Sequence, residues 1–220
     1  MKKFKKIIAM GCAAVMAVSA MSMSALAAEN SIEMNSEIIE CTAVIDNDTS
    51  RTFSINVPSG LSETERKTYI VQAAANEMKN NNGVSAQSAN GITYYAQGTA
   101  YNFSVPKNGD TVQSTEGPFT NITLNSDVCA LAVMFERKTG AATSYNARFE
   151  YVNAFNSSDK RSSYLNRSAT SGSCTIFFTD GATAYPDDMV VSSRYVYDLY
   201  VSANTSGGKA DITLFAGVIE

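Results

Sequence analysis

The sequence predicts a mainly β protein, in which an antiparallel β-sandwich or jelly-roll-like domain follows a small β-β-α unit. Residues 92–220 contain seven or eight strand-like runs separated by turn-forming residues, a spacing typical of two-sheet folds. Ten of the eleven tyrosines lie after residue 90, and tyrosine favours strands. Apolar residues recur at helical spacing in only one segment after the N-terminal leader, and it begins near residue 62.

Residues 1–27 have the pattern of a secretory signal peptide. Four lysines among the first six residues precede the uncharged apolar run Ile7–Ala20, and Ala25-Leu26-Ala27 forms a small-x-small cleavage site. We therefore expect a secreted, extracellular protein of bacterial type whose mature chain starts near residue 28. No later segment has the roughly 20 consecutive apolar residues of a spanning helix, so we expect no membrane insertion after cleavage.

Residues 28–80 are predicted to form the β-β-α unit. Strands are expected from Ile38 and over 51–57, where apolar and polar residues alternate. The helix begins with a Ser62-x-x-Glu65 capping box. Residues 81–91 are small, polar and aperiodic, which predicts a linker. The sequence leaves open whether 28–80 is a stable domain or a removable pro-segment.

A hairpin at the centre of the sandwich organises the predicted domain. Residues 127–139 and 144–155 are strand-like and flank Gly140, and the second run alternates strictly between apolar and polar residues. Residues 156–173 are polar and predict a long loop with at most a short strand near Tyr164. The other expected strands are 92–105 (broken near Gly98), 111–113, 119–124, 174–179, 189–201 and 210–219, with a further loop at 180–188.

Composition argues against common enzyme classes and against nucleic acid. The sequence has no histidine, which removes the usual general base and the usual partner of a serine or cysteine nucleophile. The chain carries 17 basic and 21 acidic residues, and loss of four leader lysines leaves 13 against 21, a net charge of −8. An acidic chain without a basic run predicts no nucleic-acid partner. We therefore expect a non-enzymatic protein.

Three cysteines follow the leader, and they show no metal-binding or redox spacing. Cys41, Cys129 and Cys174 are far apart in sequence and form no CxxC pair. One interpretation is a Cys129–Cys174 disulfide, because both residues lie in strand-like runs of the same domain and the protein is exported. The alternative is three buried thiols that act as small apolar side chains.

Tyrosines are the candidate ligand-binding residues. Aromatic rings stack on sugar faces and are enriched in protein interfaces. Tyr164 and Tyr185 are placed in predicted loops, where binding residues concentrate. Tyr195 and Tyr197 share one face of a predicted strand, where packing in the core is the competing interpretation.

Carboxylates offer two further hypotheses. Asp180, Asp187 and Asp188 in one loop, or Asp46 with Asp48, supply oxygen ligands of the kind that calcium prefers, although neither stretch has a known loop spacing. No other cofactor is expected.

Glu136 and Glu150 lie on the two strands of the predicted hairpin, so they are the candidate pair for a carboxylate-dependent glycoside hydrolase. Charge pairing with the neighbouring Arg137 and Arg148 is the simpler explanation.

The sequence thus favours a secreted, non-enzymatic β-sandwich protein that binds an extracellular glycan or a surface protein. A structural subunit of an extracellular assembly or matrix is the alternative, and a hydrolase is the third hypothesis.

Overall fold

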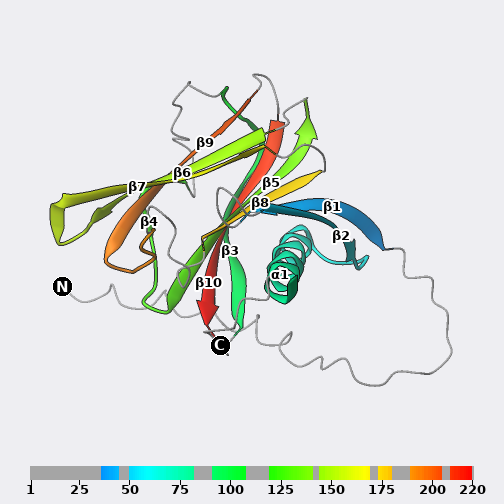
Figure 1. Ribbon diagram of the computed structural model, residues 1–220, viewed down its shortest axis with the longest axis horizontal. Coiled ribbons are helices and arrows are strands. Elements are labelled where there is room, and N and C mark those ends of the chain that lie inside the picture. Colours follow the sequence, from blue (N-terminus) through cyan, green and yellow to red (C-terminus); the bar gives the residue numbers. More distant parts are fainter. Residues whose placement is uncertain are drawn as a thin grey trace, which may run out of the picture. The chain divides into compact units, whose positions relative to one another are not determined.

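The computed structural model describes residues 36–44, 50–81, 91–107, 119–140, 144–168, 173–179, 189–204 and 209–219, without the side chains of 79–81 and 164–168. The predicted signal peptide, most of the linker and the loop 180–188 lie outside these residues. The described elements are, in order, β1 (Glu37–Val44), β2 (Ser50–Val57), α1 (Glu63–Asn81), β3 (Ile92–Ser104), β4 (Ile122–Thr123), β5 (Val128–Thr139), β6 (Ser144–Asn153), β7 (Asn156–Ser168), β8 (Cys174–Thr179), β9 (Tyr195–Ala203) and β10 (Lys209–Ile219) (Figure 1).

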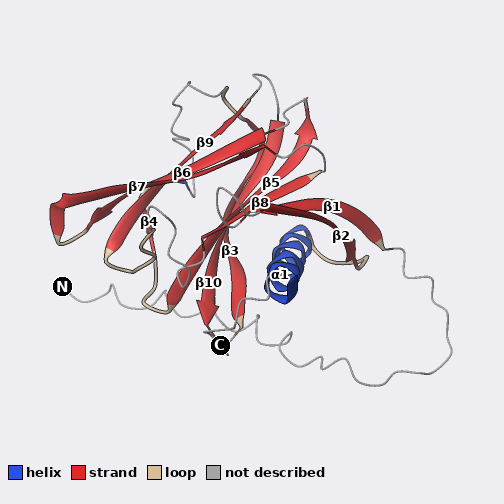
Figure 2. Ribbon diagram, in the orientation of Figure 1, coloured by secondary structure: helices blue, strands red, loops and turns tan. Residues whose placement is uncertain are grey.

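The strands form two sheets, which confirms the predicted mainly β, sandwich-like fold (Figure 2). The six-stranded sheet has the order β2-β1-β8-β5-β10-β3, and the four-stranded sheet has the order β4-β9-β6-β7. One apolar core fills the space between the sheets, and a second lies between the six-stranded sheet and α1. The six-stranded sheet is therefore buried on both faces, which explains why β5, β8 and β10 are apolar almost throughout.

The predicted β-β-α unit is part of the larger sheet. β1 pairs with β2 as an antiparallel hairpin, as expected, and its other edge pairs in parallel with β8, where Cys41–Val44 lie opposite Cys174–Phe177. The hairpin of β1 and β2 therefore belongs to the same sheet as β8, β5, β10 and β3. Local patterns revealed the hairpin and the helix, but the parallel pairing joins segments far apart in sequence and has no local signature.

Helix α1 begins as the sequence predicts. The Ser62 backbone N–H donates to Glu65 Oε2 at 2.8 Å, and the Glu65 N–H donates to Ser62 Oγ at 3.4 Å, which completes the capping box. The buried positions of α1 follow helical spacing and pack on the six-stranded sheet: Lys67, Ile70, Val71, Ala74 and Met78. Among the described residues, no helix has the length and apolar character needed to cross a membrane.

The predicted central hairpin of β5 and β6 was wrong. β5 pairs with β8 and β10, whereas β6 pairs with β7 and β9 in the other sheet. Gly140, at φ +92°, ends β5 in a conformation that favours glycine, and the chain then crosses to the second sheet. A glycine turn between two alternating runs fits a hairpin and a crossing between packed sheets equally well, so the local sequence did not distinguish them.

Two segments of the four-stranded sheet differ from expectation. β7 is a strand of thirteen residues where a loop was predicted; it lies at the edge of its sheet and pairs only with β6, so it can remain polar. β9 starts at Tyr195 rather than at residue 189. β3 has the expected irregularity, since its register against β10 shifts between Ala96 and Gly98.

Candidate functional site

The four-stranded sheet has one face in the core and one face that no described element covers. Buried and half-buried residues alternate from Tyr145 to Val152 on β6 and throughout β9, as expected for a sheet with one solvated face. Helix α1 lies against β1, β2 and β3, on the far side of the larger sheet. We call the solvated side the outer face, and its residues on β6 and β9 are Asn146, Arg148, Glu150, Val152, Val196, Asp198, Tyr200 and Ser202.

An aromatic–cationic pair lies at the centre of the outer face. Arg148 on β6 is the register partner of Tyr200 on β9, and its guanidinium carbon lies 4.5 Å from the centre of the Tyr200 ring. Arg148 Nη2 also contacts Glu150 Oε1 at 3.1 Å. Burial, together with the charge of Glu150, raises the pKa of Tyr200, so its hydroxyl remains protonated near neutral pH. This row therefore presents a ring, a cation and a carboxylate side by side.

Hydrogen-bonding groups flank this pair. Asn146 Nδ2 donates to Ser202 Oγ at 3.3 Å, and Asp198 Oδ1 accepts from the Asn121 backbone N–H at 2.8 Å. The face is thus largely polar and of mixed charge. The Tyr164 backbone on β7 is the other register partner of Arg148, so this predicted binding residue falls in the Tyr200 row.

Tyr195 and Tyr197 lie in the core between the sheets. The Tyr197 hydroxyl donates to the carbonyl of Val190 at 2.7 Å, and burial raises its pKa to about 12. The Tyr195 hydroxyl donates to Asp159 Oδ2 at 2.7 Å. Their rings pack on Tyr151, at 5.3 Å for Tyr195 and 5.2 Å for Tyr197 between ring centres. Both tyrosines therefore stabilise the sandwich, as the competing interpretation held.

Tyr185, Asp180, Asp187, Asp188, Asp46 and Asp48 lie outside the described residues. The calcium hypothesis for these aspartates stays a prediction.

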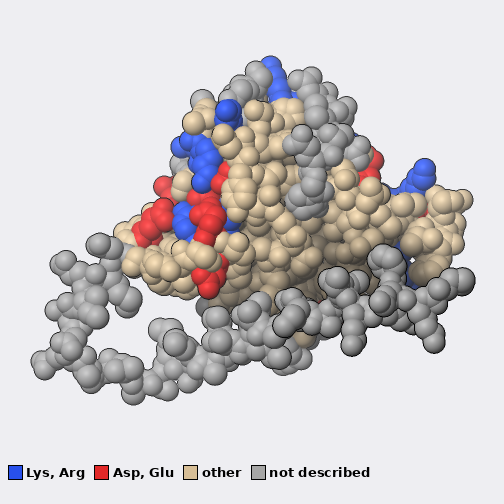
Figure 3. Space-filling view, turned by 180° about the vertical axis from the view of Figure 1, so that it is seen from behind, with Lys and Arg blue, Asp and Glu red and all other residues tan. Residues whose placement is uncertain are grey.

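A cluster of charged side chains lies where α1 meets the ends of β5 and β10. We call it the ion-pair cluster, and its members are Glu37, Glu63, Arg66, Lys67, Glu136, Lys138 and Asp211. Lys67 Nζ lies 3.1 Å from Glu63 Oε1 and 3.4 Å from Asp211 Oδ2, and 4.6 Å from the centre of the Tyr101 ring. On the face drawn in Figure 3, acidic and basic side chains intermingle on one side, and much of the remaining described surface is uncharged.

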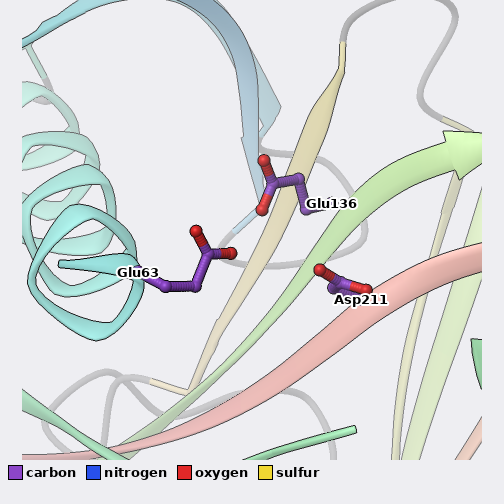
Figure 4. A group of neighbouring side chains, drawn as sticks. All are labelled: Glu63, Glu136 and Asp211. Atoms are coloured by element: carbon purple, nitrogen blue, oxygen red, sulfur yellow. The ribbon is translucent and has the colours of Figure 1, made fainter. Parts of the chain in front are cut away.

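Three carboxylates of the ion-pair cluster converge. Oxygens of Glu63, Glu136 and Asp211 lie within 4.8 Å of one another, and Figure 4 shows the three side chains pointing toward a common centre. Such a set is able to ligate a hard cation. Lys67, Arg66 and Lys138 already supply the opposing charge, and a metal ion would have to displace the buried Lys67 ammonium. The arrangement is therefore that of an ion-pair network joining α1 to the sheet.

The electrostatics of the cluster favour charged forms. Burial opposes the charge on Arg66, but the hydrogen bond to Glu37 and the charge of Glu136 outweigh it and raise the Arg66 pKa. Burial also opposes ionisation of Asp211, yet its hydrogen bonds from the Asn102 N–H and from Lys138 lower its pKa. Arg66 and Asp211 therefore remain ionised near neutral pH.

The predicted catalytic pair is separated by the fold. Glu136 belongs to the six-stranded sheet and contacts Arg66 at 2.9 Å, whereas Glu150 lies on the outer face and contacts Arg148. The expectation that Glu136 and Glu150 face each other across a hairpin was therefore wrong, because β5 and β6 are in different sheets.

The predicted Cys129–Cys174 disulfide is also wrong. Cys174 lies opposite Glu136 in the β5–β8 register, seven residues along β5 from Cys129, which is a separation of about 23 Å. A disulfide requires Cα atoms within about 7 Å. Cys129 instead donates to the carbonyl of Gly217 at 3.4 Å.

Sequence reasoning missed the outer face and the ion-pair cluster for different reasons. The alternation along β6 and β9 places Arg148 and Tyr200 on the faces that point away from the core. That the two residues are neighbours could be known only from the order of the strands in the sheet. The ion-pair cluster contains residues from β1, α1, β5 and β10, which are far apart in sequence. The one feature of the sequence that indicated it was Lys67, a charged residue among the apolar positions of α1.

Searches against protein-family models, curated proteins and solved structures found no match for this chain.

Proposed function

We propose that this chain is a secreted, non-enzymatic β-sandwich protein that binds an extracellular glycan through the outer face of the four-stranded sheet. The Arg148–Tyr200 pair carries the proposal. A tyrosine ring on a solvated sheet face offers an apolar surface to the C–H face of a sugar, and the hydroxyl end remains polar. The neighbouring carboxylates and amide supply donors and acceptors for sugar hydroxyls.

Three features support binding rather than catalysis. The sequence contains no histidine. The carboxylates considered for hydrolysis lie in different sheets, where Glu136 contacts Arg66 of α1 and Glu150 contacts Arg148. The outer face presents its side chains on two regular strands, which hold them in fixed positions as a binding platform requires. Export would bring this face into contact with polysaccharides outside the cell.

The test is binding of purified residues 28–220 to a polysaccharide and glycan array, in calcium and again in chelator. Saturable binding that Tyr200→Ala reduces about tenfold is the expected result, because tenfold corresponds to about 1.4 kcal/mol, at the upper end of the range of about 0.5–1.5 kcal/mol for aromatic contacts. Tyr69→Ala, a matched change on the exposed side of α1, should leave binding unchanged. Binding that depends on calcium would move the site to the loop containing Asp180, Asp187 and Asp188.

A blank array would contradict the glycan proposal and would favour a protein ligand for the same face. A pull-down with cell-surface proteins, repeated with Tyr200→Ala, then separates a protein partner from non-specific adhesion.

A structural subunit of an extracellular assembly is the second candidate, and one observation favours it. Phe155 is 86% exposed in the two-residue turn between β6 and β7, where an apolar ring has no packing partner among the described residues. In this case the mass measured by analytical ultracentrifugation should rise with concentration, and Phe155→Ser should abolish the rise. A monomer at every concentration would contradict assembly.

A further inference from the structure

Cys41 and Cys174 lie side by side on neighbouring strands. Cys41 is on β1 and Cys174 opens β8, and the two are register partners in the parallel pairing of these strands. Neighbouring strands lie about 4.8 Å apart, which is inside the range of about 4.4–6.8 Å that Cα atoms of a disulfide span. The pair therefore satisfies the backbone requirement that Cys129 and Cys174 fail.

The two side chains also meet. Both thiols are fully buried in the core between the six-stranded sheet and α1, and they are hydrogen-bonded to each other. Cys129 lies elsewhere, at the start of β5, and is half-buried. Of the three cysteines that follow the predicted leader, Cys41 and Cys174 are therefore neighbours, and Cys129 is separate from them.

We propose that Cys41 and Cys174 form a disulfide in the exported protein and that Cys129 remains reduced. The proposal adds a covalent modification site to the fold. It rests on the geometry of β1 and β8, and export provides the oxidising surroundings in which such bonds persist.

The oxidant is an external disulfide, such as that of a thiol–disulfide oxidoreductase or oxidised glutathione. The thiolate of one cysteine attacks this disulfide, forms a mixed disulfide and releases one thiol. The second thiolate then attacks the protein sulfur of the mixed disulfide and displaces the other thiol. Two protein thiols lose two electrons and two protons, and the external disulfide is reduced to two thiols.

This exchange belongs to folding rather than to the folded state. In the folded protein the hydrogen bond with Cys41 and burial raise the pKa of the Cys174 thiol, so little of the attacking thiolate is present. Burial also denies the external disulfide access to either sulfur. The bond should therefore form before α1 closes over β1 and β8, and the completed core then protects it from reduction.

The consequence is a covalent attachment of the β1–β2 hairpin to the sandwich. The parallel pairing that joins this hairpin to β8 covers only four residues of each strand. A disulfide at the first of these pairs closes a long loop of chain, which restricts the unfolded state and stabilises the native one.

The test is oxidative refolding of residues 28–220 in a glutathione redox buffer, followed by alkylation under denaturing conditions and tryptic mass mapping. We expect a linked peptide pair containing Cys41 and Cys174, lighter than the separate peptides by two hydrogens, and an alkylated Cys129. Reduction should make all three cysteines reactive. Since the refolding is done in vitro, its result is independent of export and of glycan binding.

Three matched variants complete the test. Cys129→Ala should give the same linked pair, and the oxidised form should melt about 10 °C above the reduced form. Cys41→Ala and Cys174→Ala should each abolish the redox-dependent shift in melting temperature. Native-like circular dichroism with three alkylated cysteines in the oxidised sample, or a linked pair that includes Cys129, would overturn the proposal.

Discussion

Lys67 Nζ lies 3.4 Å from Asp211 Oδ2, and the two side chains are only 2% and 5% exposed. The contact joins the first turns of α1 to the start of β10, so it links an early part of the chain to its last strand. Lys67 also occupies the first position of the buried stripe of α1, ahead of Ile70 and Val71, which pack on the sheet. Its ammonium group is tolerated there because Glu63 and Asp211 both accept from it.

Removing one member of this buried pair should destabilise the protein strongly. Lys67→Met leaves Asp211 with Lys138 as its remaining cation, and we expect the free energy of unfolding to fall by about 2–4 kcal/mol. Urea denaturation monitored by circular dichroism measures the change. The matched control is Lys209→Met on the exposed end of β10, which should alter stability by less than about 0.5 kcal/mol. Equal losses for the two variants would contradict a stabilising role of the buried pair.

The ion-pair cluster also predicts how stability depends on pH. The pKa values of Glu37, through its hydrogen bond with Arg66, and of Asp211 are both lowered in the folded state. A carboxyl group whose pKa is lower in the folded than in the unfolded state stabilises the protein at pH values above its unfolded-state pKa, which is about 4. This stabilisation is lost as the pH falls through the folded-state pKa. The urea midpoint should therefore decline below about pH 4. Asp211→Asn should show a shallower decline, and an unchanged slope would exclude Asp211 as a contributor.

Gln72 on α1 should protect the open edge of β3. Its amide Nε2 donates to the carbonyl of Ile92 at 3.0 Å, and its Oε1 accepts from the Tyr94 N–H at 3.1 Å, as a neighbouring strand would. Gln72→Ala removes both bonds and should cost about 1–2 kcal/mol. The Tyr94 amide should exchange faster with deuterium. Gln72→Glu keeps the acceptor and loses the donor, so it should retain more of the Tyr94 protection than Gln72→Ala does.

Gly217 on β10 should tolerate no side chain. A Cβ built there would lie 2.7 Å from Ile92 Cγ2, 3.0 Å from Tyr94 Cε1 and 3.1 Å from Ala130 Cβ. Gly217→Ala therefore forces the β3 and β5 side chains apart and should destabilise by about 1–3 kcal/mol. Gly91→Ala, where a Cβ meets nothing within 4 Å, is the matched control and should be neutral or slightly stabilising. Similar melting temperatures for both variants would show that the core beside Gly217 adapts.

The parts of this fold that sequence predicted are those whose signals are local. The capping box at Ser62 fixed the start of α1, and alternation around Phe53 identified β2. The final apolar run became β10. Each of these depends on side chains a few residues apart, so a single stretch of sequence contains the whole signal.

The parts that sequence missed depend on pairing between distant segments. The β5–β6 crossing, the β1–β8 parallel pair and the cluster around Lys67 each bring together residues with no shared local pattern. β7 was missed for the opposite reason, because an edge strand needs no apolar face and its polar residues resemble a loop. Of the candidate binding residues, Tyr164 is a register partner of Arg148, which also pairs with Tyr200. The alignment of these three residues across β7, β6 and β9 could not be predicted without the strand order.

The most direct test of the proposed binding face is an NMR titration of the isotope-labelled chain with the glycan that binds most strongly on the array. The account predicts that shifted backbone amides cluster on β6, β7 and β9, are largest near Arg148 and Tyr200, and disappear in Tyr200→Ala. Shifts confined to α1 and the ion-pair cluster, with the amides around Tyr200 unmoved, would contradict it.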